Sequence, residues 1–163
     1  KIEIFCEEMF KRHLPDEVPA IPKYIQEWES PFGKEAEKYP LQVIGTHFMP
    51  RMHSTLANVD WNNEAFPQRV FINPHDAEDR GIKNGQKVKI YNDRGTVILP
   101  CRITRRILPG VVNIPQGAGW KPDTEGNAIG GSVNTLTSER WTPFTFGNAQ
   151  HTIMAEVAAL GSG

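Results

Sequence analysis

Residues 72–86 read INPHDAEDRGIKNGQ and follow the apolar run Val70–Ile72. Asn73 is a good N-cap, and Pro74 fits the first position of a helix. Asp76 then places a carboxylate near the free amide N–H groups of the first turn. The stretch therefore predicts a strand that leads into a short, capped helix. Nucleotides are commonly held at such helix starts, although most of these starts bind nothing.

A two-stranded hairpin follows this helix, which Gly81 is expected to end. Lys87–Tyr91 alternates polar and apolar residues with the period of a half-buried strand. Asn92–Gly95 is a turn sequence, and we expect Gly95 to take a positive φ there. Thr96–Thr104 is the expected return strand. The pattern favours an antiparallel pair beside the helix.

Further short strands are expected on both sides of the hairpin, at Leu41–Thr46, Val111–Ile114 and Thr152–Val157. An irregular polar loop is expected over 47–63. Residues 116–131 form a Gly-rich loop whose length favours a functional role over a simple connection. Many short strands with one clear helix indicate a mostly β barrel rather than a parallel α/β sheet.

The first forty residues differ from the rest, being rich in Pro, Glu and Lys and lacking apolar periodicity. Their prolines prevent a long helix, although Ile2–Leu14 has room for a short one. We expect residues 1–40 to be a linker or strap, 41–158 to be the barrel domain, and 159–163 to be a tail that an expression vector could have added. Without an initiator Met, the chain is expected to be a piece of a longer protein.

Composition limits the function classes. The chain has 163 residues and a formal charge of −1, which suits one domain with an ordinary core. The absence of a basic excess weakens a nucleic-acid role, and the apolar runs are too short to cross a bilayer. Cys6 and Cys101 are too few and too separated for a disulfide scaffold or a zinc site. We expect an edge thiol and a buried strand thiol.

Catalysis by this chain's own side chains is disfavoured. The five histidines match no zinc-ligand spacing, so we assign no metal ligand and expect surface or hydrogen-bonding roles. Ser54 directly follows His53, and adjacent residues cannot form a nucleophile–base pair. The chain also lacks a Gly-x-Ser-x-Gly elbow. A small hydrolase is therefore the weakest functional hypothesis.

Two polar segments are better candidates for ligand binding. Residues 46–55 follow a strand and gather an arginine, two histidines and three hydroxyls, which suits a diphosphate. An ordinary solvated loop is the alternative there. Asn134–Thr137 and Gly147–Thr152 carry amides and hydroxyls with almost no charge, which suits the edge of a heterocycle. Turn capping is the alternative for this second cluster.

The order of these motifs resembles the C-terminal molybdopterin guanine dinucleotide-binding domain of the dimethyl sulfoxide reductase family, over about three quarters of the chain. The last motifs look closest to the catalytic subunit of anaerobic dimethyl sulfoxide reductases. The motifs that carry the resemblance are the loop from Thr46–His47 to His53–Thr55, Ile72–Ala77, Gly81–Gly85, Asn92–Gly95, Pro109–Val112, Asn134–Thr137 and Gly147–Thr152.

The resemblance implies a six-stranded double-psi β-barrel with a few short helices, and it implies ligand contacts. One set would meet the pterin and the pyrophosphate, namely Thr46, His47, Arg51, His53 and Ser54. A second set would face the guanosine, namely Asn73 and Asp76. A third would lie along the pterin edge, namely Asn134, Thr135, Asn148 and Gln150. The implied cofactor is molybdopterin guanine dinucleotide with molybdenum or tungsten, shared with domains outside this chain.

The resemblance also implies a parent oxidoreductase of anaerobic respiration that transfers oxygen atoms, as in dimethyl sulfoxide reduction, while this piece is inactive alone. Implied partners are the parent's other domains, an iron–sulfur electron-transfer subunit and a membrane anchor, on the cytoplasmic or periplasmic face of a prokaryotic membrane. Direct membrane insertion and nucleic-acid binding are not expected. The alternative is a protein-binding adaptor barrel without cofactor. Convergence of Arg51, Asp76 and Gln150 would favour the cofactor.

Overall fold

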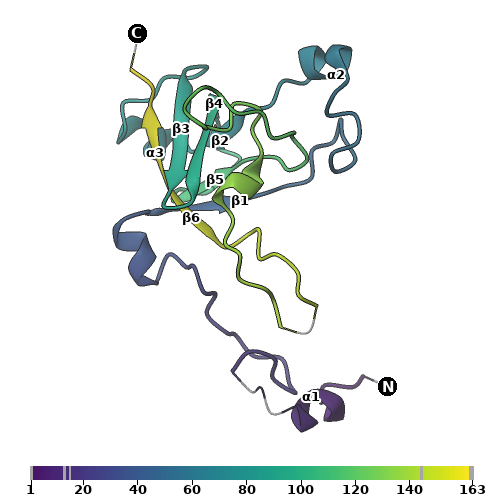
Figure 1. The fold of residues 1–163 in the computed structure, drawn as a ribbon. Coiled ribbons are helices and arrows are strands. Elements are labelled where there is room, and N and C mark those ends of the chain that lie inside the picture. The colour runs from purple at the N-terminus through teal and green to yellow at the C-terminus, as the bar shows by residue number, and fades with distance from the viewer. Residues whose placement is uncertain (1, 13, 15, 144, 162–163) are drawn as a thin grey trace.

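Six strands close into a barrel in the order β1–β5–β2–β4–β3–β6. The structure is a computed structural model that describes residues 2–12, 14, 16–143 and 145–161. Figure 1 shows the barrel with short helices at its margins, so the mostly β, six-stranded barrel is confirmed. The strands are β1 (Leu41–Ile44), β2 (Val70–Ile72), β3 (Lys87–Asn92), β4 (Gly95–Ile103), β5 (Val111–Asn113) and β6 (Ile153–Ala159). The helices are α1 (Glu7–Lys11), α2 (Asp60–Ala65), α3 (Pro74–Glu78) and the 3₁₀ turns η1 (Lys34–Glu37) and η2 (Val133–Leu136).

Two parallel strand pairs decide where the loops emerge. β1 pairs with β5, and β2 pairs with β4, while the other neighbours are antiparallel. In the first pair Ile44 lies opposite Asn113. The backbone ladder continues past both strands, because the Gln116 N–H donates to the Thr46 carbonyl at 2.9 Å. The loops that follow β1 and β5 therefore leave the barrel side by side.

The barrel interior is filled by alternating apolar side chains from all six strands. Val43, Val70, Ile90 and Val112 are among the residues with no exposed surface. Cys101 lies in this core on β4, and its burial raises the pKa of its thiol. Cys6 is exposed, so both cysteine expectations are confirmed.

Helix α3 forms as its local sequence predicts. The Asn73 side chain accepts from the His75 N–H at 2.9 Å, Pro74 is the first helical residue, and Gly81 takes φ +61° beyond the helix end. Helix α2 was not predicted. α2 lies partly within the segment expected to be an irregular loop, and its N-cap, Val59, provides no side-chain cap that the sequence could have signalled.

We expected a positive φ at Gly95, and this expectation was wrong. Gly95 is not among the residues with positive φ. A Cβ atom at Gly95 would instead lie 2.7 Å from Cγ2 of Thr135, so the glycine is needed because η2 approaches the hairpin closely. Asn92 secures the same contact by donating its side-chain amide to the Leu136 carbonyl at 3.0 Å.

The segment before β1 extends away from the barrel. Helix α1, near its N-terminal end, lies well away from the strands in Figure 1. Glu29 ties this segment to the barrel by accepting from the Met154 N–H at 3.1 Å and from Arg94 at 2.8 Å. Tyr39 donates to Asp93 at 2.7 Å, and Lys38 pairs with the same carboxylate. β6 runs to Ala159, one residue past the boundary expected at 158.

Within the described ranges, no helix combines the length and the apolar character needed to span a bilayer.

Candidate functional site

A polar cavity of about 250 Å³ lies where four segments meet at one end of the barrel. The segments are the loop after β1, the loop after β5, η2 and the loop before β6. Hydroxyl, amide and imidazole groups dominate the lining, which suits a ligand that both donates and accepts hydrogen bonds. The lining residues are His53, Ser54, Gln116, Gly117, Ala118, Ser132, Val133, Asn134 and Gln150.

Gln116 joins the segments around this cavity. It is only 8% exposed, its Nε2 donates to Nδ1 of His47 at 3.1 Å, and its Oε1 accepts from Nε2 of Gln150 at 3.1 Å. The bond to Nδ1 leaves Nε2–H of a neutral His47 ring as a donor. The His47 and His53 rings lie edge to face with centroids 5.2 Å apart. Two predicted residues, His47 and Gln150, are thus linked by Gln116, which the sequence did not identify as a site residue.

Close contact between two loops shapes the cavity wall. Gly117 has φ +87°, and a Cβ atom there would lie 1.8 Å from the carbonyl oxygen of His53. His53 itself takes φ +52°. No residue other than glycine can hold this backbone approach without moving one of the loops. His53 and Ser54 are therefore positioned by the glycine opposite them.

Arg51 is a buried cation, 7% exposed, that is connected through Gln68 to the loop that carries Gln116. Its guanidinium donates to Gln68, whose amide also donates to the Pro115 carbonyl at 2.6 Å, next to Gln116. It also lies 4.5 Å from the centroid of the Phe48 ring. Burial lowers the pKa of Arg51, and its Nε atom is buried without a hydrogen-bond partner.

No ion pair of the described residues includes Arg51. A buried guanidinium that lacks an anion is costly, so its environment favours a negatively charged ligand nearby.

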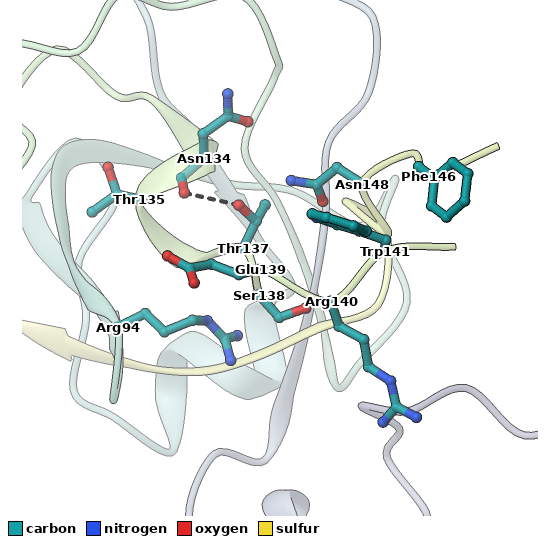
Figure 2. A pocket seen from close by; sticks show the side chains of 10 residues that line it. All are labelled: Arg94, Asn134, Thr135, Thr137, Ser138, Glu139, Arg140, Trp141, Phe146 and Asn148. Atoms are coloured by element: carbon teal, nitrogen blue, oxygen red, sulfur yellow. Dashed lines mark hydrogen bonds between the residues drawn. The ribbon is translucent and has the colours of Figure 1, made fainter. Parts of the chain in front are cut away.

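A larger groove of about 990 Å³ (Figure 2) adjoins the cavity, because Asn134 lines both. The arginines of the groove already have partners: Arg94 donates to Glu29 and to the Leu136 carbonyl, and Arg140 stacks 4.2 Å from the Trp28 ring. Oγ1 of Thr135, a neutral group, is buried without a partner. The groove is lined by Arg94, Asn134, Thr135, Thr137, Ser138, Glu139, Arg140, Trp141, Phe146 and Asn148.

Asn73 and Asp76 lie elsewhere and already have internal partners. Oδ2 of Asp76, a residue 8% exposed, accepts from the Gly110 N–H at 2.9 Å. Asn73 donates to the Ile107 carbonyl at 2.7 Å besides capping α3. These bonds hold α3 against the turn that leads into β5. Neither residue lines the cavity or the adjoining groove.

The expected convergence is therefore partial. Gln150 lines the cavity, Arg51 is connected to the cavity loop only through Gln68, and Asp76 faces the Gly110 turn. Arg51 and Asp76 are both buried rather than directed into solvent. Thr46 is exposed, and its amide and hydroxyl both donate to Oδ1 of Asn113, at 3.3 and 3.0 Å. It belongs to the outer wall of the barrel beside the site.

Comparison with known proteins identifies relatives over most of the chain. Residues 41–154 match the family model described as "Molydopterin dinucleotide binding domain". Dimethyl sulfoxide reductase DmsA of Haemophilus influenzae is 41% identical over 98% of this chain and 21% of that protein. Its Escherichia coli K12 counterpart is 39% identical over 96% of this chain and 20% of that protein. The chain thus spans about a fifth of the length of the curated relatives it matches.

Among solved structures, acetylene hydratase from Pelobacter acetylenicus superposes with a TM-score of 0.79 over 98% of this chain and 23% of that one. The two sequences are 17% identical over this match, so the likeness establishes the fold alone.

Proposed function

Because this chain belongs to the molybdopterin dinucleotide-binding domain family, we propose that its cavity end binds the pterin and pyrophosphate of molybdopterin guanine dinucleotide. The chain is a cofactor-binding domain of the dimethyl sulfoxide reductase family of molybdenum oxidoreductases. The observation that carries the assignment of the site is a pair of buried polar atoms without partners. They are Nε of Arg51, whose guanidinium is linked through Gln68 to the cavity loop, and Oγ1 of Thr135, which lines the adjoining groove. Buried polar atoms of native proteins nearly always have partners, so a bound ligand accounts for both.

The residues at the cavity end fit the chemistry of the cofactor. Arg51 supplies positive charge for the pyrophosphate, with Thr46, His47, His53 and Ser54 as neutral donors nearby. Amide groups, which both donate and accept, suit the pterin edge. Those residues are Asn134, Asn148 and Gln150, with the Thr135 hydroxyl beside them. Gln116 fixes the orientation of His47 and Gln150 and is added to the site on that ground.

Asn73 and Asp76 are proposed to face the guanosine. Oδ2 of Asp76 already accepts from the Gly110 N–H, so a guanine contact would use Oδ1. Asn73 uses its side-chain oxygen on the α3 cap and its amide on Ile107, which leaves less capacity for a ligand. Their polar groups thus serve the fold as well as the proposed ligand.

When bound, the cofactor supplies the redox centre for oxygen-atom transfer, and the domain supplies binding and orientation. We extend the proposal to the parent protein: it reduces a substrate such as dimethyl sulfoxide, and it receives electrons through an iron–sulfur subunit held by a membrane anchor. The names of the relatives support the activity. The remaining four fifths of the relatives' length leave room for the other domains that share the cofactor.

The test is an assay of the parent protein purified from cells able to make the cofactor. Molybdenum or tungsten would be measured by elemental analysis, together with guanosine monophosphate released by acid. We expect metal and nucleotide together. If neither is found, the protein-binding adaptor becomes the better hypothesis and the cofactor proposal is wrong.

A further inference from the structure

A row of outward-facing residues crosses four neighbouring strands of the barrel wall. In the strand register Ile44 of β1 lies opposite Asn113 of β5, Asn113 opposite Phe71 of β2, and Phe71 opposite Arg102 of β4. The first three are half-buried, and Arg102 is exposed. Since adjacent strands lie about 4.8 Å apart, this row runs for about 15 Å across the wall.

A groove of about 310 Å³ follows this row, bordered by the segment that leaves β4. Its floor is apolar, made by Ile44, Phe71 and Ile107, and two exposed guanidinium groups, those of Arg102 and Arg106, stand at its edge. Within the described ranges neither arginine belongs to an ion pair. By contrast, Arg80 of the same barrel is paired with Glu156 at 2.6 Å.

We propose that this groove docks an extended, carboxylate-bearing segment of the parent polypeptide that lies outside residues 1–163. The two guanidinium groups favour an anionic partner. The apolar floor favours a partner with apolar side chains, which a free phosphate lacks. The relatives are about five times as long as this chain, so most of the parent polypeptide must be arranged around the domain. The inference rests on the chain being part of a longer protein. Because the groove shares Thr46 with the proposed cofactor site, the measurements below include an outcome that separates a docked segment from the cofactor.

Carbodiimide coupling in the intact parent tests the proposal directly. The reagent activates a carboxylate, an adjacent amine displaces it as a urea, and an amide bond remains. Arg106→Lys places an amine at the groove edge, and Arg105→Lys is the matched control, because Arg105 is exposed and is not among the groove residues. We expect mass spectrometry to find position 106 joined to an Asp or Glu outside residues 1–163, with position 105 unlinked. Links within residues 1–163, equal linking from both positions, or no link would overturn the proposal.

A second measurement uses the unaltered parent and does not depend on a variant that folds. Phenylglyoxal modification of arginine would be followed at Arg102, Arg106 and Arg105. A docked segment held by about 1.4 kcal/mol exposes the groove in about one molecule in ten, so Arg102 and Arg106 should react about tenfold more slowly than Arg105. Equal rates would overturn the proposal. Protection that vanishes in cofactor-free parent would assign the groove to a phosphate of the cofactor instead and would also overturn it.

Discussion

The cavity end of the barrel and the start of α3 contain similar polar residues but differ in whether those residues have partners. At α3, the Asn73 side chain donates to the Ile107 carbonyl and accepts from the His75 N–H, and Oδ2 of Asp76 accepts from the Gly110 N–H. At the cavity end, Arg51 and Thr135 keep buried atoms without partners. A satisfied buried polar group stabilises the fold, whereas an unsatisfied one costs free energy until a ligand completes it. Substitutions at the two regions should therefore fail in different ways.

Gly117→Ala should give the largest effect, because it removes the cavity wall. The new Cβ atom would lie 1.8 Å from the His53 carbonyl, and φ +87° is strained for alanine. Backbone strain of this kind costs about 1–3 kcal/mol before the clash is counted. We expect the parent to lose most of its bound guanosine monophosphate, measured after acid release. Gly119→Ala is the matched control, since nothing lies within 4 Å of its added Cβ. Equal nucleotide content in both variants would contradict the assigned wall.

Asp76→Ala should reduce stability and cofactor content together. It leaves the Gly110 N–H without its charged acceptor, a loss of about 1.5–3 kcal/mol. We expect faster amide hydrogen exchange in β5 of the parent and a lower molybdenum content. Glu78→Ala, at an exposed position of the same helix, should change neither. Equal molybdenum content in the two variants would show that Asp76 is not part of the cofactor site. Unchanged amide exchange in β5 would show that Asp76 does not stabilise the fold.

Arg51→Met should separate the two effects. The methionine fills similar space without a buried charge and without the unpartnered Nε, and its stability cost is limited to the hydrogen bond lost to Gln68, about 0.5–1.5 kcal/mol. The lost charge-assisted contact to the cofactor corresponds to about 1.5–3 kcal/mol, or about tenfold to a hundredfold weaker retention. Nucleotide content and amide exchange of the parent would be measured side by side. Reduced stability with full nucleotide content would show that Arg51 serves the fold instead.

Asp93→Asn should give the smallest effect, at the exposed tie between the N-terminal segment and the barrel. Hydrogen bonds from Lys38 and Tyr39 lower the pKa of Asp93, and the same contact raises the pKa of Lys38 to about 12. Because the pKa of Asp93 is lowered in the folded protein, the interaction stabilises the fold above pH 3.8, the ordinary carboxyl pKa. This stabilisation is lost as the pH falls through the lowered pKa. The raised amine pKa makes the tie favourable below 10.5 and weakens it as the pH rises through about 12.

The measurement is the difference in amide exchange at residues 38–39 between the parent and its Asp93→Asn variant, as a function of pH. We expect a small, constant difference between these limits that disappears in acid. A difference that grows in acid would contradict the tie.

Local rules in the sequence were enough to predict the strands and α3. The Asn-Pro start of α3 and the turn glycines act over a few residues, so pattern and conformation agree there. Gly95 was misjudged because its constraint comes from Thr135, forty residues away in sequence. The sequence of the turn between β3 and β4 contains no information about a residue that approaches it from so far along the chain.

The candidate site could be predicted only in part for the same reason. Thr46–Ser54 and the late amide motifs stood out by composition, but Gln116 and Gln68 act through contacts that exist only once β1 and β5 pair in parallel. Gln116 directly follows Pro115 at the end of an expected strand, and this position was the available signal. The internal partners of Asp76 were equally invisible, because Gly110 lies in a different turn.

Asn134→Leu in the parent protein tests the central claim most directly. Asn134 is exposed, lines both the cavity and the groove, and no side-chain hydrogen bond holds it among the described residues. Its amide contacts to the pterin should be worth about 0.5–1.5 kcal/mol each, so two lost contacts reduce cofactor retention about fivefold to a hundredfold. We predict less released guanosine monophosphate with amide exchange of the barrel unchanged. Full nucleotide retention, or a loss that appears only with faster barrel exchange, would contradict the account.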